Sequence, residues 1–238
     1  MSGYKLKEGK YSTTNLSDAE VWSSFEKVFS PKAQHSSSYK YIFLASIFKC
    51  TEEDKLTFSF TEVFSYFLEY YWILITKWHL RQETVKTRIT EVEKIINDYR
   101  IMNPDVTLQN MKKEDYYALV DEIVKKCQTY VVGALYSDTN QQMYSFSKKE
   151  KYISINPTYK TFIQIHRSSL EDLLYYDLAK YYIRINDLEY FKWVKERSHI
   201  KYDDNLFFAR EIIANVFEGK PDFSSQLIDK LNNKNHLL

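Results

Sequence analysis

The chain has 238 residues, which is enough for one large domain or two small ones. Its hydrophobic fraction of 44% and aromatic fraction of 17% exclude a disordered protein, and its 4 glycines and 4 prolines favour long helices over a turn-rich β-sandwich. The formal net charge of +1 does not demand a nucleic-acid partner, although a balanced total can hide a basic face.

The two cysteines, Cys50 and Cys127, are too few for a disulfide framework. The N-terminal stretch MSGYKLKEGKYSTTN contains no apolar signal core, and no apolar run is long enough to span a bilayer. We therefore expect a cytoplasmic protein with free thiols and no membrane partner.

Helix-start signals predict the first elements. Residues 1–16 are polar, and we expect them to form a flexible N-terminus. Ser17 and Glu20 form a capping box, which predicts a helix that ends near Phe29. A second helix is predicted from about Ser38 to Cys50, with large apolar side chains at helical spacing.

The most aromatic stretch runs from Phe58 to Trp78, where nine of 21 residues are aromatic. Ser59 and Glu62 form a second capping box, so a helix is predicted there. Large side chains recur on one face at the helical period. Another face of this helix also carries large side chains, and we expect that face to be either covered within the fold or bound by a protein partner. This candidate partner interface consists of Tyr66, Tyr70 and Ile73.

Two further helices are predicted over about Glu83–Arg100 and Lys112–Tyr136, and they complete a helical domain over residues 17–136. The first of them is amphipathic, and its apolar stripe includes Val85 and Ile89. Charged residues spaced three or four apart fill its other face, where ion pairs support a helix modestly.

The pattern changes after residue 136. Gln142–Phe146 and Lys151–Ile155 alternate around the polar turn Ser147–Glu150, which predicts a β-hairpin. Thr161–His166 also alternates and is a candidate third strand.

Three C-terminal helices follow. They are predicted from Ser168 or Ser169 to about Asn186, over Asp203–Glu218 and over Phe223–Leu231. Residues 137–238 therefore form a short β region followed by helices, either as a second domain or packed with the first. The expected fold class is mainly α: a bundle-like multi-helix domain with a β-hairpin or three-stranded insertion near residues 142–166.

Motifs for catalysis, metal binding and phosphate binding are absent: the sequence has no HExxH, CxxC, GxxxxGK[ST], GxGxxG or GxSxG. Cys50 and Cys127 fall on the inward stripes of predicted helices, as buried cysteines do. A nuclease with scattered acidic ligands would depend on Asp203 or Asp204 with Glu218-Gly219-Lys220, but that glycine fits a helix end better. We assign no catalytic residue, metal or cofactor.

Basic residues gather around the predicted hairpin and the start of the next helix. A helix N-terminus can hold an anion, and lysines interleaved with Tyr144, Tyr152 and Tyr159 suit a phosphate backbone with stacked bases. An ordinary solvated hairpin is the alternative, because lysine is usually exposed. The candidate nucleic-acid-binding residues are Lys148, Lys149, Lys151, Lys160, His166 and Arg167.

Ser37-Ser38-Tyr39-Lys40 leading into YIFLASIF, and LAKYYIRIN at Leu178–Asn186, resemble the helical N-terminal region of bacterial HNH-endonuclease-domain proteins. The resemblance covers Asp18–Asn186 in outline. The family's nuclease module would need a His–Asn–His constellation after Asn186, where this chain has only His199 and His236 and no cysteine. The resemblance therefore implies the helical accessory part without the nuclease, and no catalytic residue carries over.

Three functions remain open. The first is a non-catalytic accessory subunit, which the aromatic surplus favours because aromatic side chains are enriched at interface cores. For it the resemblance implies a bacterial anti-phage defence complex, with an SMC- or ABC-type ATPase or a nuclease as partner. The second is a nucleic-acid-binding module that uses the basic hairpin, which would make DNA a partner. A divergent nuclease is the third alternative.

Overall fold

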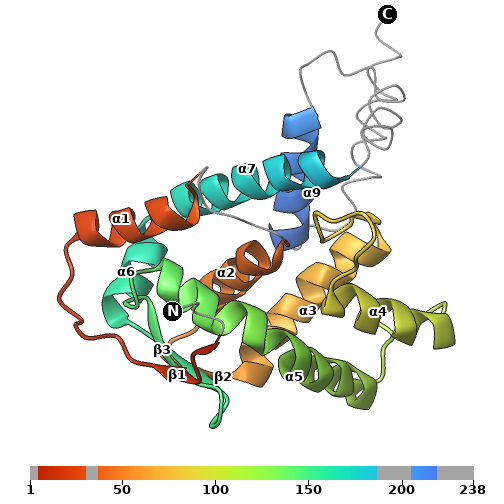
Figure 1. Cartoon of the computed structure of the whole chain (residues 1–238), viewed down its shortest axis with the longest axis horizontal. Coiled ribbons are helices and arrows are strands. Elements are labelled where there is room, and N and C mark those ends of the chain that lie inside the picture. Colours follow the sequence, from red (N-terminus) through yellow and green to blue (C-terminus); the bar gives the residue numbers. More distant parts are fainter. Residues whose placement is uncertain (1–4, 31–36, 187–204, 219–238) are drawn as a thin grey trace, which may run out of the picture. The chain divides into compact units, whose positions relative to one another are not determined.

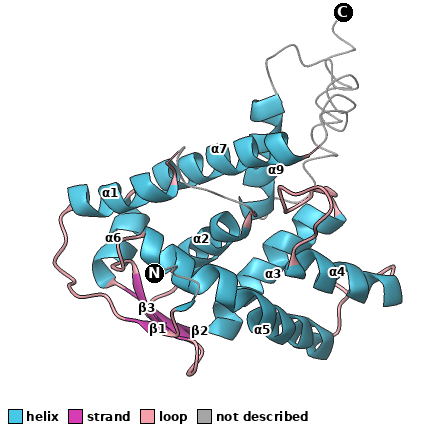
Figure 2. Cartoon of the chain, in the orientation of Figure 1, coloured by secondary structure: helices cyan, strands magenta, loops and turns pink. Residues whose placement is uncertain are grey.

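The computed structural model describes residues 5–30, 37–186 and 205–218. Within these ranges the chain is mainly helical, with eight helices (62%) and one small four-stranded antiparallel sheet (Figure 2). This confirms the predicted fold class. The chain divides into two compact units, Met1–Leu174 and Tyr175–Leu238.

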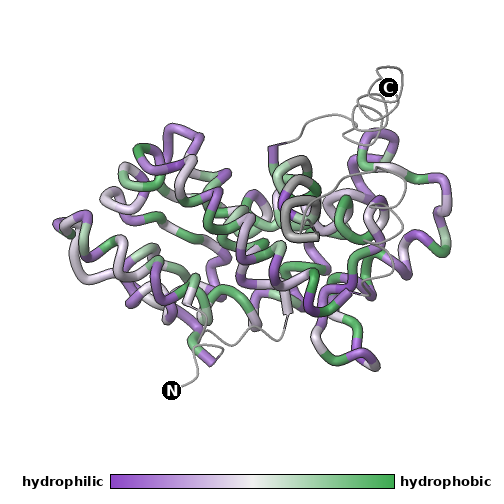
Figure 3. Tube along the Cα trace, turned by 90° about the horizontal axis from the view of Figure 1, so that it is seen from above, coloured by the Kyte–Doolittle hydropathy of each residue, from purple (hydrophilic) through white to green (hydrophobic). Residues whose placement is uncertain are grey.

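Several helices begin where the sequence predicts them. The capping boxes at Ser17 and Ser59 are both formed. In each, the serine hydroxyl accepts a hydrogen bond from the backbone N–H of the glutamate, and the glutamate carboxylate accepts one from the backbone N–H of the serine. Hydrophobic residues recur at short intervals between hydrophilic ones along the trace, as expected of helices with one buried face (Figure 3). The helices are α1 (Asp18–Val28), α2 (Tyr39–Cys50), α3 (Phe60–Thr76), α4 (Glu91–Met102), α5 (Lys113–Asp138), α6 (Pro157–Ile165), α7 (Arg167–Ile185) and α9 (Asn205–Glu218).

The core of the first unit is built around the aromatic helix α3. Helices α2 and α5 lie beside it and beside each other (Figure 1). Phe67 is fully buried, and its ring centroid lies 4.7 Å from that of Tyr71 and 5.2 Å from that of Phe64. Phe43 of α2 packs on the same rings, 5.5 Å from Phe64. Such edge and tilted contacts add to the stabilisation from burial alone.

Four short strands form the sheet in the order β1-β3-β4-β2, all antiparallel. The N-terminal strand, red in Figure 1, lies beside the later strands of the hairpin. One face is apolar and buried, with Gly9, Phe146, Ile153 and Phe58 side by side across the strands. The strands are β1 (Glu8–Gly9), β2 (Thr57–Ser59), β3 (Tyr144–Ser147) and β4 (Tyr152–Ile155).

The predicted hairpin is confirmed, but its third strand is not Thr161–His166. That segment belongs to helix α6. Asn156 caps the helix by accepting a hydrogen bond from the Thr158 N–H, and Pro157 occupies the first helical position. An asparagine followed by proline is a helix-start signal, and it prevails over the alternation of the next residues.

The added strands come from elsewhere in the chain, and this corrects the expected N-terminus. Residues 8–14, which we expected to be flexible, pair with or hydrogen-bond to the hairpin region. The Tyr136 hydroxyl donates to the Lys10 carbonyl oxygen at 2.8 Å, and the Asn156 amide donates to that of Thr13 at 2.8 Å. Strands from both sides of residue 136 share one sheet, and the two compact units divide after Leu174.

The fourth predicted helix begins later than expected. α4 starts after Thr90, which forms a capping box with Glu93, and Val85 and Ile89 lie in the preceding loop with exposed side chains. A buried polar network holds that loop. Gln82 accepts a hydrogen bond from the Ser38 hydroxyl at 2.7 Å, and its N–H donates to the Glu93 carboxylate at 3.1 Å. Burial raises the pKa of Glu93.

In the second unit, the part of α7 from Tyr175 onward has a buried face. Leu178, Tyr181, Tyr182 and Ile185 are all buried. The Tyr175 and Phe217 rings stack with centroids 5.4 Å apart, which joins this part of α7 to α9. The predicted helix over Phe223–Leu231 lies outside the described residues.

Both cysteines are fully buried in the core. Burial raises the pKa of Cys50 and raises that of Cys127 to about 12. The Cys127 thiol donates to the Tyr39 hydroxyl at 3.7 Å. None of the helices in the described part of the chain is both long enough and apolar enough to cross a membrane.

Replacing Gly9 with alanine should displace β1. An added Cβ would lie 2.6 Å from the Tyr136 ring and 2.8 Å from the Phe146 ring, both buried. Overpacking of this kind destabilises a protein by about 1–3 kcal/mol. We expect a loss of that size in urea unfolding, and faster hydrogen exchange at the Lys148 amide, which donates to the Lys7 carbonyl oxygen.

The matched control for this variant is Glu8→Ala on the same strand, since the Glu8 side chain is exposed. It should leave the Lys148 amide protected. Unchanged protection in Gly9→Ala would show that β1 does not depend on the missing side chain.

The two thiols should not react with Ellman's reagent at neutral pH in the folded protein, because a buried thiol with a raised pKa supplies almost no thiolate. Both should react in denaturant. A Ser168→Cys variant, which places a thiol at an exposed position, should react at once and serves as the control. Rapid reaction of the folded wild-type chain would contradict the burial of the cysteines.

Candidate nucleic-acid interface

The structure separates the predicted basic residues into two groups. Arg167 belongs to the group that is used inside the fold. Its Nε donates to Glu171 Oε1 at 2.5 Å, Nη1 to the Phe48 carbonyl oxygen at 2.9 Å and Nη2 to Glu52 Oε1 at 2.8 Å. The guanidinium thus ties the start of α7 to the end of α2, and its donors are directed at protein acceptors.

Lys160 and His166 also contact other residues of the fold, Lys160 through hydrogen bonds and His166 through ring packing. Lys160 Nζ donates to the carbonyl oxygens of Glu53 at 2.5 Å and Lys55 at 3.2 Å. The His166 ring packs against Phe162 with centroids 4.4 Å apart. These residues and Arg167 stabilise the loop after α2 and the α6–α7 junction, and that they bind nucleic acid stays a prediction.

Of the three tyrosines that alternate with the lysines, Tyr144 and Tyr159 are buried in the core. The hydroxyl of buried Tyr144 donates to the Val132 carbonyl oxygen at 2.6 Å. That of buried Tyr159 donates to the Ser24 hydroxyl at 2.7 Å. Burial raises the pKa of both phenols. Only Tyr152 of these three remains partly exposed.

The second group lies on the β3–β4 turn, and here the structure adds lysines that the sequence did not place. The Lys148 N–H donates to the Lys7 carbonyl oxygen at 2.8 Å, which brings the N-terminal segment against the turn. Lysines of the two segments therefore form one surface, which we name the lysine edge. The lysine edge consists of Lys5, Lys7, Lys10, Lys148, Lys149 and Lys151.

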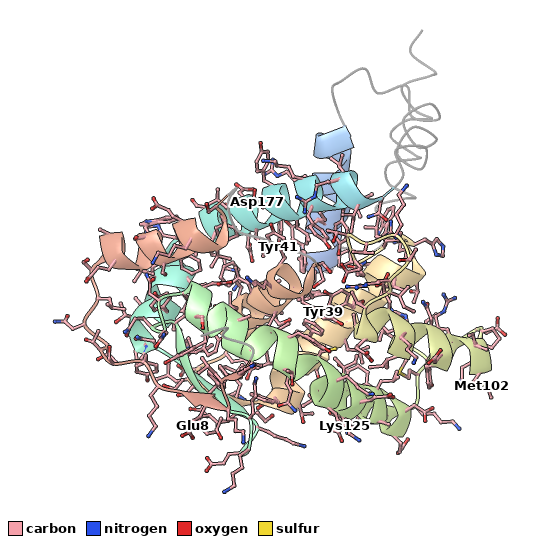
Figure 4. All side chains as sticks on the ribbon, in the orientation of Figure 1. Glu8, Tyr39, Tyr41, Met102, Lys125 and Asp177 are labelled. Atoms are coloured by element: carbon pink, nitrogen blue, oxygen red, sulfur yellow. The ribbon has the colours of Figure 1, made fainter. Side chains whose placement is uncertain are left out.

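The lysine edge is far more basic than the chain as a whole. Residues 5–10 and 147–151 contain these six lysines and two glutamates, Glu8 and Glu150, for a formal charge of +4 against +1 for the whole chain. Long side chains with nitrogen at their tips project from this end of the sheet, around Glu8 (Figure 4). The local charge is therefore hidden in the overall balance.

Most of these ammonium groups are exposed and have no acidic partner. Lys148 is half-buried, and desolvation lowers its pKa. The other five lysines are exposed, and no residue in the described ranges forms an ion pair with them. By contrast, Lys55 is paired with both Glu53 and Glu62 at the opposite edge of the sheet. These five lysines can therefore bind external anions without first breaking an ion pair.

The N-terminal half of this surface could not be found from the local pattern. A strand of two residues has no alternation to detect, and β1 exists because it pairs with β3. Gly9 is the one local signal, since its missing side chain leaves room for the Tyr136 ring.

The predicted partner interface on α3 is only partly open. Tyr70 is 7% exposed, while Tyr66 and Ile73 are partly exposed. The Tyr66 hydroxyl donates to Glu53 Oε1 at 3.3 Å, and burial raises the pKa of Tyr66 to about 12. That these residues bind a partner stays a prediction.

The nuclease alternative rests mainly on residues outside the described ranges. Asp203, Asp204, Gly219 and Lys220 lie there, as do His199 and His236. Within the described residues, no group of three or more histidine, cysteine or acidic side chains is placed to hold a metal ion.

Comparison with known proteins finds no match to this chain among protein-family models, curated proteins or solved structures. Inferences about function therefore depend on this chain's own residues.

Proposed function

We propose that the protein binds nucleic acid, and that the lysine edge holds the phosphate backbone. The observation that carries the proposal is the pairing of β1 with β3, which adds Lys5, Lys7 and Lys10 to the three lysines of the turn. Phosphate neutralisation by lysine and the release of bound counterions supply most of the affinity of sequence-tolerant nucleic-acid binding.

The chemistry of the surrounding surface favours a nucleic acid as the polyanion. Beside the lysines, Thr57 and Ser154 present hydroxyl side chains at outward positions of the sheet, whereas the hydroxyls of Ser59 and Ser145 form hydrogen bonds within the fold. Serine and threonine hydroxyls are common ligands of phosphate and sugar oxygens. A lipid surface would instead be favoured by large apolar side chains beside the charges.

Neutralising either half of the lysine edge should weaken binding and flatten its salt dependence. We expect the triple variants Lys5→Gln/Lys7→Gln/Lys10→Gln and Lys148→Gln/Lys149→Gln/Lys151→Gln each to bind at least about tenfold more weakly at low salt. Each should reduce the slope of log K against log salt by about 2, since a single-strand phosphate contact contributes about 0.7. Fluorescence anisotropy with labelled oligonucleotides over a salt series measures both quantities.

The matched control is Lys125→Gln/Lys126→Gln, which removes exposed lysines from α5; Lys125 lies apart from Glu8 in Figure 4. It should leave the slope nearly unchanged. Equal losses in the control and the triple variants would point to a nonspecific effect of net charge, and no binding by the wild-type chain would refute the proposal.

We propose an accessory subunit as the second candidate function, favoured by the exposed end of α4. Ile101 and Met102 are 75% and 79% exposed, and Tyr117 is exposed at the start of α5, which packs against α4. Exposed large apolar side chains act as anchors when they enter a partner's pocket. The resemblance to HNH-endonuclease-domain proteins suggests the context, a bacterial anti-phage defence complex with an SMC- or ABC-type ATPase or a nuclease.

Co-expression with the products of neighbouring genes tests the second function. The tagged wild-type chain should recover one of them in a fixed ratio, and Ile101→Asp/Met102→Asp should abolish that recovery, because a carboxylate is costly to bury in an apolar pocket. Ile165→Asp is the control, since Ile165 is 71% exposed at the end of α6. Recovery of no neighbour, or equal loss in both variants, would count against this interface.

A further inference from the structure

Tyr152 differs from the other tyrosine of the sheet in how its side chain is used. The ring and hydroxyl of Tyr144 are enclosed in the core. Tyr152 is partly exposed, and no described residue forms a hydrogen bond with its hydroxyl or an aromatic contact with its ring. Most tyrosines near the sheet use their polar end within the fold, as Tyr136 and Tyr159 do. Among the described residues, the Tyr152 hydroxyl has no hydrogen-bond partner of this kind.

The register of the strands places Tyr152 on the outer face. It lies opposite Ser147 of β3 on one side and Ser59 of β2 on the other. The next residue, Ile153, is buried between Phe146 and Phe58 on the inner face. Successive side chains of a strand point to opposite faces, so the Tyr152 ring stands on the side that faces away from the helical core.

The backbone under Tyr152 is fixed relative to the lysine edge. Tyr152 follows Lys151 directly, and β4 is the inner strand of the hairpin, paired on both sides. The Lys151 carbonyl oxygen accepts a hydrogen bond from the Phe60 N–H at 2.8 Å, which anchors this point to the start of α3. An aromatic ring is therefore held one residue away from Lys151, one of the exposed lysines of the lysine edge.

We infer that the nucleic acid is single-stranded, and that Tyr152 stacks on one of its bases while the lysine edge holds the adjacent phosphates. This inference rests on the proposed function. A basic track beside an aromatic platform is the arrangement that binds single strands without strong sequence preference, because every base has a π-face. In a duplex the bases are already stacked on one another, so Tyr152 would gain nothing from it.

The hydroxyl side chains next to Tyr152 complete the surface. Thr57 and Ser154 lie in the neighbouring cross-strand row, with their oxygens 3.0 Å apart. Each hydroxyl can donate or accept, so the row can contact base edges or sugar oxygens of different nucleotides. This favours sequence-tolerant binding.

Anisotropy titrations with labelled oligothymidine of about 20 nucleotides, and with a duplex of equal length, test the inference. We expect wild-type protein to bind the single strand at least about tenfold more tightly than the duplex. Tyr152→Leu should lose about tenfold in single-strand affinity, keep its duplex affinity and keep its salt slope, because no phosphate contact is removed. Tyr152→Phe should retain wild-type affinity, since stacking needs the ring and not the hydroxyl.

The outcomes separate this inference from the proposed function. If the lysine variants lose binding but Tyr152→Leu does not, or if the duplex binds as well as the single strand, the inference is wrong and the lysine edge stands. If neither nucleic acid binds, or only anionic phospholipid vesicles do, both are wrong.

A photocrosslink tests the same contact in the unaltered chain, in case Tyr152→Leu disturbs folding. Irradiation with an oligonucleotide that carries 5-iodouracil should give a peptide adduct at Tyr152, identified by mass spectrometry. Adducts formed only at other residues would overturn the stacking role. Prior addition of unlabelled single strand should suppress the adduct.

Discussion

The structure of the first unit depends on the burial of helix α3 on most of its circumference. Phe60, Phe64, Phe67 and Tyr71 are fully buried, and Tyr70 on another face is nearly so. Helices α2 and α5 pack on this helix and on each other. Because aromatic side chains bury large areas and hold fixed relative orientations, the three helices form a rigid frame for the shorter elements.

The sheet is attached to this frame at Ser59. That residue ends β2 and caps α3, so the chain passes from strand to helix without a connecting loop. At the same point the Phe60 N–H binds the Lys151 carbonyl oxygen of the hairpin. The β3–β4 turn, and with it three lysines, is therefore positioned by the start of the core helix. β1 completes the sheet edge because Gly9 leaves room for the Tyr136 ring.

The parts of the fold that the sequence predicted are those with a local physical signal. Two capping boxes, Ser17 with Glu20 and Ser59 with Glu62, predict helix starts to within a few residues. The hairpin is predicted by the alternation of apolar and polar residues around a polar turn. Thr90 with Glu93 is an equally good signal, but the apolar spacing of Val85 and Ile89 suggested an earlier start. These two side chains are exposed in a loop, whose position is set by Gln82 and other contacts distant in sequence.

The candidate site was predictable to a similar extent. The turn lysines were found, since a polar turn must be exposed, but β1 was not, because a strand of two residues exists only through its partner. Arg167 and Lys160 show the converse case. From sequence alone, a basic residue near a predicted anion site is expected to be free to bind that anion. In the structure these two side chains instead bind a carboxylate and carbonyl oxygens at the end of α2 and in the loop after it.

The two tyrosines of the hairpin show that strand register decides whether an aromatic ring is buried in the core or exposed to a ligand. Composition treats Tyr144 and Tyr152 alike, although Tyr144 alternates in phase with Phe146 and Tyr152 in phase with Ser154. In the hairpin, Ser147 pairs with Tyr152 and Tyr144 pairs with Ile155, which puts the two rings on opposite faces. A slip of one residue in β4 would bury Tyr152 and expose Ile153. The register of this short hairpin, fixed by Phe146 and Ile153 against the core, thus decides which ring a ligand can reach.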